Sequence, residues 1–497
     1  MRHRDSPLHI SPERFRQIGH QLVDQIAALL ESIPDRPVTR DESPSAVRDA
    51  LGLNGPLPQD GEDPAVLVDG LARTIADHSL FNGHPRFFGY ITSSPAPIGM
   101  LGDLLASALN PNVGGWLLGP AASEIEGQTV RWIAELIGYP NDCGGLLVSG
   151  GNMANFVCFL AARAAGAHWD VRADGVNDGS RPALRCYASA ETHTWIQKAA
   201  DLTGIGTAGI RWIPTDDRLR MNVAVLAERL AADKAAGDLP FIVVGTAGSV
   251  STGAVDPLVE IGSLCRDQGV WFHVDGAYGG FAAGVPGASV DLQALANADS
   301  VAVDPHKWLY APLEAGCALV GDAEALRRAF SYHPAYYHFE EKATNYVDFG
   351  PQNSRGFRAL KVWLALRQAG ASGYRRMIGE DIALSRAMAD AVAAHPELEL
   401  VTQDLSITTF RYVPADLRAN GSQAARDYVD RLNRALLDAL QHGGEVFVSN
   451  AVISGRYVLR ACIVNFHTAL DDVQAVPDIV VRTGQGIDAG MRPQELR

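Results

Sequence analysis

The segment at residues 300–311, SVAVDPHKWLYA, brings chemically active side chains to the end of a predicted strand. The apolar run at 301–303 is typical of a buried strand, and it stops at an Asp-Pro pair. His306, Lys307 and Trp308 follow directly. A lysine amine shielded from water loses its proton readily, and the neutral amine forms a Schiff base with an aldehyde. Taken alone, Lys307 is explained more simply as a lysine at a strand end whose amine reaches solvent. The residues at the ends of other predicted strands favour a catalytic role instead.

A glycine turn follows another predicted strand, at 146–148. Gly150, Gly151 and Asn152 lie between this strand and a predicted helix. Glycines let backbone N–H groups approach a ligand and a helix N-terminus favours an anion, so a phosphate group fits there. The turn lacks the Gly-Lys-Ser/Thr of a P-loop and is not a convincing dinucleotide fingerprint. A packing role for the two glycines is equally compatible with the pattern.

Asp275 and His193 also follow predicted strands. An unpaired carboxylate at the end of an apolar strand is costly to desolvate, so Asp275 either caps the next turn or faces a cation. A protonated pyridine nitrogen is one such cation. His193, at the start of a helix, is either structural or able to stack on an aromatic ring and exchange protons.

These signals together fit one cofactor, pyridoxal 5'-phosphate. The glycine turn offers a phosphate site, Lys307 an imine, Asp275 a partner for the ring nitrogen and His193 a cover for the ring face. The protonated pyridine ring stabilises a carbanion at the α-carbon of an amino acid. Each signal is weak by itself, and their places at the ends of separate strands make the combination specific.

Composition excludes several other classes of protein. The 497 residues exceed one ordinary domain, with 47% hydrophobic and 20% charged residues, as in globular proteins. A net charge of −15 argues against a nucleic-acid or anionic-membrane partner. The six scattered cysteines suggest neither a disulfide framework nor a metal site such as zinc. The start of the chain lacks a signal-peptide pattern and no run reaches membrane-spanning length, so we expect a cytoplasmic protein.

Strand and helix patterns alternate from 146 to 320, which predicts an α/β fold with a mostly parallel sheet and flanking helices. In such sheets ligands bind beyond the carboxyl ends of the strands, where the residues above fall. We expect an N-terminal helical segment (1–85), a large cofactor-binding domain (86–380) and a small C-terminal α+β domain (381–497). Ser11 should cap the first helix, and Ser123, with Glu126 three residues on, a later one.

The chain resembles the group II pyridoxal-phosphate-dependent amino-acid decarboxylases, the family of aromatic-L-amino-acid, tyrosine and histidine decarboxylases in the fold-type I (aspartate aminotransferase-like) superfamily. The likeness runs from about residue 84 to 366 and is carried by HVDGAYGG and DPHKWL, with HPRFFGY, SGGNMAN and SRGFRALKVW in support. It implies decarboxylation of an L-amino acid to its amine and carbon dioxide. It also implies a homodimer with shared active sites, in which the N-terminal helices wrap the partner.

The resemblance also implies roles for individual residues. Lys307 resembles the imine lysine, Asp275 the partner of the pyridinium nitrogen and His193 the stacked histidine. Further cofactor contacts fall on Ala277 against the ring, Thr246 near the ring hydroxyl, and Gly151, Asn152 and His306 on the phosphate side.

In the segment HPAYYHFEEK, Tyr336 resembles the tyrosine of a mobile loop that returns a proton to the α-carbon. Relatives with Phe at this position tend to be aldehyde synthases, so Tyr336 favours simple decarboxylation. A shift of one residue in the alignment would exchange Tyr336 with Tyr337.

The substrate pocket departs from the family pattern at several positions. The usual pair of arginines is Arg355-Gly356, and Gly114 or Gly115 stands where aromatic-specific members carry a bulky ring. Ile91 follows Tyr90 where Phe is common, whereas Ser354 matches phenol-preferring members. With Trp116 of the irregular segment 110–120, the pocket candidates are Tyr90, Ile91, Trp116 and Ser354. An aromatic amino acid is one candidate substrate, and its identity stays open.

Three alternatives remain at this point. The same cofactor also supports aldehyde synthesis, transamination and carbon–carbon lyase chemistry. A non-catalytic cofactor-binding partner subunit is a second alternative, against which the presence of both Lys307 and Tyr336 argues. A dinucleotide-dependent oxidoreductase is the third.

Overall fold

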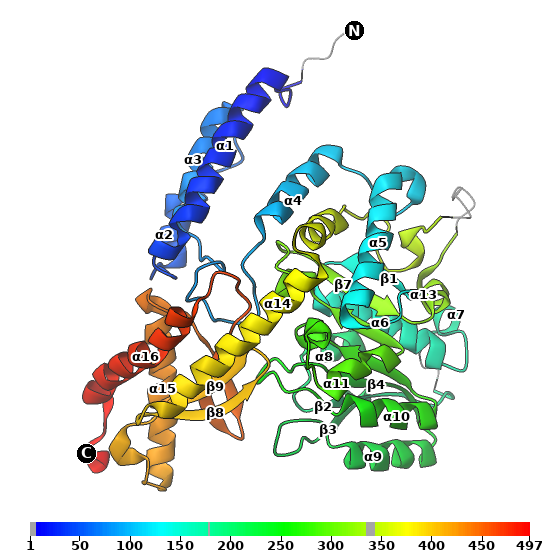
Figure 1. Ribbon diagram of the computed structural model, residues 1–497. Coiled ribbons are helices and arrows are strands. Elements are labelled where there is room, and N and C mark those ends of the chain that lie inside the picture. Colours follow the sequence, from blue (N-terminus) through cyan, green and yellow to red (C-terminus); the bar gives the residue numbers. More distant parts are fainter. Residues whose placement is uncertain (1–5, 177–178, 334–342) are drawn as a thin grey trace.

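A seven-stranded sheet forms the centre of the computed structural model, which describes residues 6–176, 179–333 and 343–497 (Figure 1). The strands lie in the order β1-β7-β6-β5-β4-β2-β3. Their bounds are β1 (Gly144–Val148), β2 (Leu184–Ser189), β3 (Ile210–Ile213), β4 (Leu239–Thr246), β5 (Trp271–Asp275), β6 (Ser300–Val303) and β7 (Gly316–Val320). Only β7 runs antiparallel to its neighbours, β1 and β6. The predicted mostly parallel sheet is therefore confirmed.

Helices cover both faces of this sheet, so every residue of β1, β6 and β7 is buried. The helices of this part of the chain are α5 (Pro120–Ile137), α6 (Gly151–Gly166), α7 (Val171–Asp174), α8 (Trp195–Leu202), α9 (Val223–Ala235), α10 (Leu258–Gln268), α11 (Val290–Gln293), α12 (Pro305–Trp308) and α13 (Ala323–Phe330).

The predicted start of α5 at Ser123 is wrong. The helix begins at Pro120, with Gly119 as its N-cap, because proline has a preset φ and no N–H group to satisfy in the first turn. Ser123 and Glu126 therefore lie inside the helix, where both are buried. Glu126 therefore does not cap the helix, and its carboxylate makes contacts in the protein core instead.

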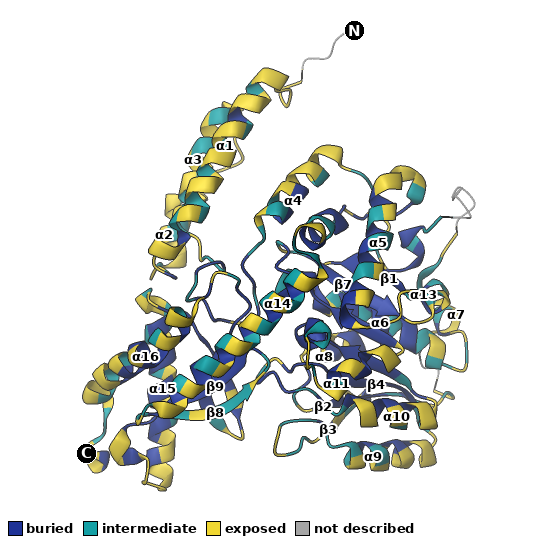
Figure 2. Ribbon diagram, in the orientation of Figure 1, coloured by how far each residue is buried: buried dark blue, intermediate teal, exposed yellow. Residues whose placement is uncertain are grey.

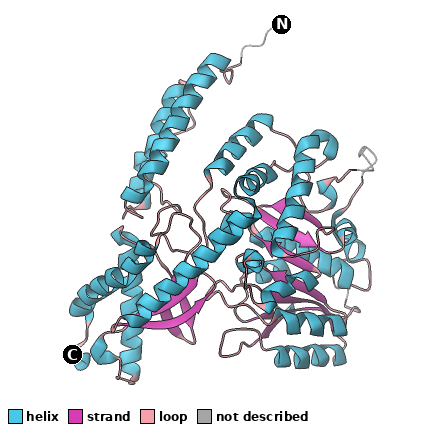
Figure 3. Ribbon diagram, viewed as in Figure 1, coloured by secondary structure: helices cyan, strands magenta, loops and turns pink. Residues whose placement is uncertain are grey.

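A second, four-stranded sheet follows, as predicted for the C-terminal part (Figure 3). It is antiparallel in the order β10-β11-β9-β8, and its elements are β8 (Leu398–Asp404), β9 (Ile407–Tyr412), α15 (Gln423–Gly443), β10 (Ser449–Ile453), β11 (Arg456–Cys462) and α16 (Leu470–Met491). The long helix α14 (Ala359–Ala394), broken at Gly370 with φ +65°, contacts α5 as well as β8 and β9. Because α14 joins both parts, the division near residue 380 remains a proposal.

The N-terminal helices stand away from the rest of the chain (Figure 1). They are α1 (Pro12–Ser32), α2 (Pro44–Ala50) and α3 (Pro64–Asp77), followed by α4 (Pro97–Leu109). Ser11 caps α1 as predicted, by accepting a hydrogen bond from the backbone N–H of Arg14. Most of α1 and α3 is exposed, and Ile18 is the only buried residue on α1 (Figure 2). Among the described residues, no helix combines the length and the apolar character needed to cross a membrane.

Candidate active site

A cavity of about 370 Å³ opens at the carboxyl ends of β1, β2, β4, β5 and β6, between the two sheets. Nine residues singled out in the sequence line it: Tyr90, Ile91, Gly151, Asn152, His193, Thr246, Asp275, Ala277 and Lys307. A larger cavity, of about 870 Å³, lies between the loop at 217–220 and β8, and none of the predicted site residues lines it. The smaller cavity is therefore the candidate active site.

Lys307 lies on the short helix α12, directly beyond β6. Its Nζ is 3.1 Å from Oδ2 of Asp304, and its backbone N–H donates to the Asp304 carbonyl over 2.9 Å. Asp304 is only 2% exposed, and its Oδ1 has no hydrogen-bond partner among the described residues. The ion pair holds the lysine amine at the cavity wall. Asp304 was read from the sequence only as the end of a strand.

The glycine turn packs closely against this ion pair. A β-carbon on Gly151 would lie 2.6 Å from Asp304 Oδ2, and Gly150 has φ +115°, which favours glycine. Helix α6 begins at Gly151, so its free N–H groups lie at the cavity. His306 supports the turn from outside the cavity lining, with Nδ1 2.7 Å from the Ala315 carbonyl oxygen. The turn thus has a packing role, and the predicted anion site at the start of α6 stays a prediction.

Asp275 is a buried carboxylate held by two donors. Its Oδ2 accepts a hydrogen bond from the indole N–H of Trp195 over 2.7 Å, and its Oδ1 accepts one from the backbone N–H of Ala277 over 3.1 Å. These donors fix the orientation of the carboxyl group, and each of its oxygens keeps capacity for another hydrogen bond. Trp195 is a site residue that the sequence reasoning did not assign, although it follows His193 by two positions.

His193 borders the cavity with an exposed face. Its Nδ1 accepts a hydrogen bond from the backbone N–H of Trp195 over 3.3 Å, so the neutral ring carries its proton on Nε2. Partial burial lowers the pKa of His193, and the negative charge of Asp275 opposes this shift. The neutral ring suits stacking against an aromatic group.

A chain of hydrogen bonds supports the floor of the cavity. Trp271 donates its indole N–H to Ser300 Oγ over 2.8 Å, and Ser300 Oγ lies 2.9 Å from Nδ1 of His273. His273 Nε2 then lies 2.7 Å from Oδ1 of Asn155, which lines the cavity. Burial lowers the pKa of His273 to about 4, so the ring is neutral near pH 7, and donation from Nε2 to Asn155 leaves Nδ1 to accept from the Ser300 hydroxyl.

Four side chains that line the cavity keep a buried polar atom without a partner among the described residues: Thr92, Thr246, Asp304 and Arg460. Thr246 Oγ1 is buried and lacks a partner among the described residues. Arg460 donates from Nη1 to the Tyr90 carbonyl over 2.9 Å and to Ser449 Oγ over 3.1 Å, whereas its buried Nε and Nη2 have no described partner. The cavity fits pyridoxal 5'-phosphate together with an anionic substrate. It offers the donors of Thr246 and Arg460 that have no described partner, the Asp275 carboxylate, the Lys307 amine and the N-terminus of α6.

Other predicted site residues lie elsewhere. Trp116 donates its indole N–H to Glu124 over 2.8 Å and is not part of the cavity lining, and Ser354 is exposed away from it. Tyr336 and Tyr337 lie outside the described residues.

Gly114 stands where the family pattern places a ring in the pocket wall, and local packing explains why this position is glycine. A β-carbon there would lie 2.1 Å from the Asn353 carbonyl oxygen, so the close approach of these two segments requires glycine.

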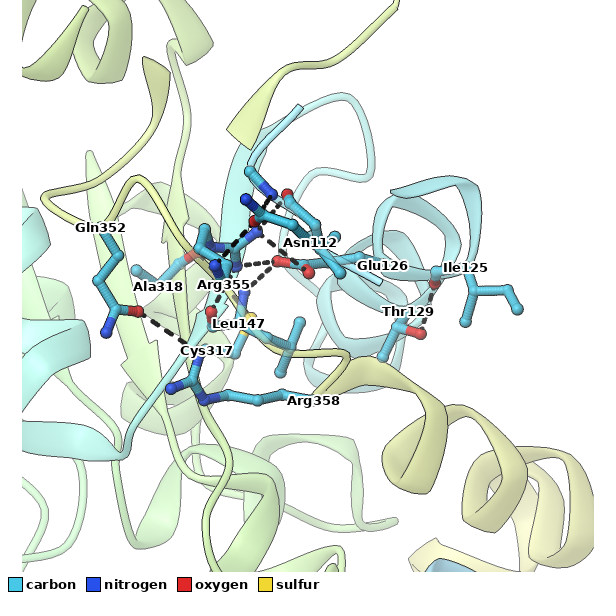
Figure 4. A network of polar contacts seen from close by, with 12 residues as sticks. Asn112, Ile125, Glu126, Thr129, Leu147, Cys317, Ala318, Gln352, Arg355 and Arg358 are labelled. Carbon is cyan, nitrogen blue, oxygen red and sulfur yellow. Dashed lines mark hydrogen bonds and ion pairs between the residues drawn. The ribbon is translucent and has the colours of Figure 1, made fainter. Parts of the chain in front are cut away.

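Arg355 belongs to a buried network beside β1 (Figure 4). Its guanidinium forms an ion pair with Glu126 and donates to the Leu147 carbonyl over 2.7 Å. Glu126 in turn accepts the Leu147 backbone N–H over 2.8 Å. Arg355 thus fixes the segment before α14 to the first strand. Gly356, where the usual second arginine is absent, is exposed, and a β-carbon there would meet open space.

The model of the pyridoxal-dependent decarboxylase conserved domain matches residues 46–413. The chain is 32% identical to an aromatic-L-amino-acid decarboxylase of Bacillus atrophaeus, over 94% of both chains. It is 30% identical to a phenylacetaldehyde synthase of Arabidopsis thaliana, over 91% of this chain and 92% of the other. Among solved structures, Oryza sativa TDC with PLP and tryptamine superposes with a TM-score of 0.89 and 27% identity, covering 97% of this chain and all (100%) of that one.

These matches extend over both sheets and the whole candidate site. The cofactor is pyridoxal 5'-phosphate, and the protein is an enzyme of the carboxy-lyase type that acts on an amino acid. By sequence, fold and cavity, this chain belongs to the pyridoxal-dependent decarboxylase family.

Proposed function

We propose that this enzyme converts an L-amino acid into the corresponding amine and carbon dioxide, with aromatic amino acids as the first candidates. One observation carries the proposal: Lys307, Asp275 and His193, from three separate strand ends, line a single cavity. The similarity to an aromatic-L-amino-acid decarboxylase supports the aromatic class. The mostly apolar residues Tyr90, Ile91 and Val250 on the cavity wall also suit an aromatic side chain.

Each end of the cofactor has residues that would hold it. Lys307 would bind its aldehyde carbon, and the α6 N-terminus with Gly151 and Asn152 would hold its phosphate. Asp275 would keep the ring nitrogen protonated, Ala277 and His193 would contact the ring, and Thr246 would contact the ring hydroxyl. When bound, pyridoxal 5'-phosphate accepts the electron pair left on the α-carbon as carbon dioxide departs.

The remaining polar groups would act on the substrate. The Nε and Nη2 nitrogens of Arg460, which have no partner among the described residues, are suited to an anionic group, and a carboxylate is the anionic group that every amino acid carries. His193, neutral and exposed to the cavity, can hold or pass a proton at Nε2. Tyr336, outside the described residues, is proposed to return the proton to the α-carbon and so to complete the amine.

We further propose a homodimer, on the basis of an apolar surface that one chain leaves open. Helices α1 and α4 border a cavity of about 660 Å³ whose lining is mostly apolar. The exposed side chains there include Phe15, Val23, Ile26, Leu101 and Leu104. Helices α1 and α3, which pack against each other with a single buried residue between them, are not stable by themselves in water. A second copy, with its own N-terminal helices, would cover this surface and complete the active site.

A cytoplasmic location is proposed from cysteine usage. All six cysteines are free thiols, and five of them are buried. Proteins of reducing compartments have this pattern. Cell fractionation with an antibody to the chain would test the assignment.

The decisive experiment has two readouts on purified protein. Borohydride reduction should attach the cofactor to the peptide that contains Lys307, as detected by mass spectrometry. Incubation with each of the twenty amino acids should then yield carbon dioxide and a matching amount of one amine. An aldehyde in place of the amine would assign the enzyme to the aldehyde synthases, and the absence of any product would assign a binding role only. A concentration-independent monomer in sedimentation would exclude the dimer.

A further inference from the structure

A buried carboxyl group lies behind the turn that carries Lys307. Asp381, on α14, is only 2% exposed and does not line the cavity. Its Oδ2 accepts a hydrogen bond from the indole N–H of Trp308 and another from the hydroxyl of Tyr310, both over 2.8 Å. Trp308 and Tyr310 follow Lys307 by one and three residues. One carboxyl oxygen of a long helix therefore fixes the lysine turn at two points.

The rings that Asp381 holds are themselves part of the site's support. Trp308 stacks on Tyr278 with ring centroids 4.7 Å apart, and Tyr278 lines the cavity. Tyr310 has φ +53°, an unfavourable backbone conformation for a residue with a bulky side chain. Such a conformation persists only where surrounding contacts impose it, and the hydroxyl bond to Asp381 is one of these contacts.

Among the described residues, the surroundings of Asp381 contain hydrogen-bond donors but no cation. Facing it are the Trp308 indole, the Tyr310 hydroxyl, the backbone N–H of Asn465 after β11, and two groups that carry or can gain negative charge, Glu380 on α14 and Cys462 on β11. No ion pair involves Asp381 in the described part of the chain. Burial raises the pKa of Asp381 to about 7, and the hydrogen bonds from Tyr310 and Trp308 oppose the rise.

We propose that Asp381 is a positioning residue for Lys307, an inference that rests on the role proposed above for that lysine. The carboxylate accepts hydrogen bonds from Trp308 and Tyr310. These bonds hold the turn 304–310 in the conformation that presents Nζ of Lys307 to the cofactor. A charged acceptor holds two donors more strongly than a neutral one. The hold therefore weakens when the carboxyl group gains a proton, and cofactor affinity weakens with it.

The test compares wild type with Asp381→Asn, which keeps the shape and removes the charge. The dissociation constant of pyridoxal 5'-phosphate for the apoprotein is measured by fluorescence quenching on both sides of neutral pH. Above neutral pH the variant should bind about tenfold more weakly, because a charged hydrogen bond is replaced by a neutral one. Below neutral pH the difference should shrink to about twofold. Hydrogen exchange of the peptide 304–311 should be faster in the apo variant.

A second variant protects the test against a folding failure. Tyr310→Phe keeps the carboxylate and its bond to Trp308, and should weaken cofactor binding by about threefold. In this variant the loss of cofactor affinity on acidification should begin at a higher pH, because the Asp381 carboxylate has lost a donor that stabilises it. Tyr139→Phe is the matched control. It removes a buried hydroxyl that donates to the Ala298 carbonyl over 2.9 Å, and should leave cofactor affinity unchanged.

The outcomes separate this inference from the proposed function. If borohydride labels Lys307 in wild type but Asp381→Asn and Tyr310→Phe match wild type in affinity at both pH values, Asp381 is only a stabilising residue and the inference is overturned. If wild type is not labelled at Lys307, the proposed function fails first.

Discussion

Trp195 and Asp275, eighty positions apart in sequence, are joined by a hydrogen bond of 2.7 Å between the indole N–H and Oδ2. The same tryptophan donates its backbone N–H to Nδ1 of His193 over 3.3 Å. One residue therefore fixes both the orientation of the Asp275 carboxyl group and the tautomer of neutral His193. Its N–H groups act on the two predicted cofactor contacts without themselves lining the cavity.

Trp195→Phe should weaken the binding of pyridoxal 5'-phosphate by about tenfold or more, because Asp275 loses the hydrogen bond that holds its carboxyl group in place. Titration of the apoprotein with cofactor measures the effect. Trp363→Phe is a suitable control, since it removes an indole bond of 2.8 Å to Gln128 outside the cavity. Equal losses in the two variants would argue for a general packing effect.

Lys307→Arg should keep a cation beside Asp304 but cannot form the imine, so turnover should fall on the order of a thousandfold. Mass spectrometry after borohydride reduction should find no cofactor on the peptide. The unfolding midpoint of the apoprotein should stay close to that of wild type. Substantial amine production by this variant would contradict the role of the lysine.

Arg355→Met should destabilise the protein by about 3–5 kcal/mol, because it leaves the buried Glu126 carboxylate without its ion-pair partner. Urea unfolding measures the loss. The double variant with Glu126→Gln should recover part of it. Arg482→Met breaks an exposed pair with Glu445 and should cost less than about 1 kcal/mol.

Acid should destabilise the protein partly through His273. Its pKa is lowered to about 4 in the folded state, below the value of 6.5 expected in the unfolded chain, so the unfolded state binds the proton first. The contribution of His273 to the free energy of unfolding is fully present above pH 6.5. It decreases by up to about 3 kcal/mol as the pH falls toward about 4.

His273→Gln should therefore flatten the dependence of unfolding free energy on pH in this window. Asp256 acts in the opposite direction, because burial raises its pKa to about 6, so the difference between variant and wild type is the informative quantity. Parallel curves for the two proteins would show that His273 titrates alike in both states.

Tyr336→Phe should retain cofactor and substrate binding while the product changes from amine to aldehyde or ketone. Quantifying both products by mass spectrometry tests this outcome, and Tyr337→Phe provides the neighbouring control. If Tyr337→Phe alone changes the product, the role belongs to Tyr337. An unchanged amine yield in both variants would remove the tyrosine from the mechanism.

Much of the fold could be predicted because local patterns carry it. The strands before Gly150, His193 and Asp275 are apolar runs that end in turn residues, and such runs mark their own carboxyl ends. The direction of β7 was not predictable in this way, since the run GCALV is equally compatible with either orientation. Ser123 has the right residue type for a cap, but Pro120 starts the helix earlier.

The parts of the site that were missed depend on long-range contacts. Trp195 reaches Asp275, and Arg460 reaches the Tyr90 carbonyl across 370 positions, so no spacing in the sequence indicates either pair. Asp304 is different, because it stands in the same motif as Lys307 and its proximity to the lysine was readable. Its burial, which makes the ion pair important, was not.

The reversal of β7 has a consequence for the lysine that lies just before it. Because β7 runs back beside β6, no crossover helix is needed, and the intervening loop starts and finishes at one rim of the sheet. Both of its stems are anchored in buried strands, and His306 links one stem to the other through Ala315. Lys307 therefore lies on a short loop that is held at both ends, which restricts its backbone more than a free loop would.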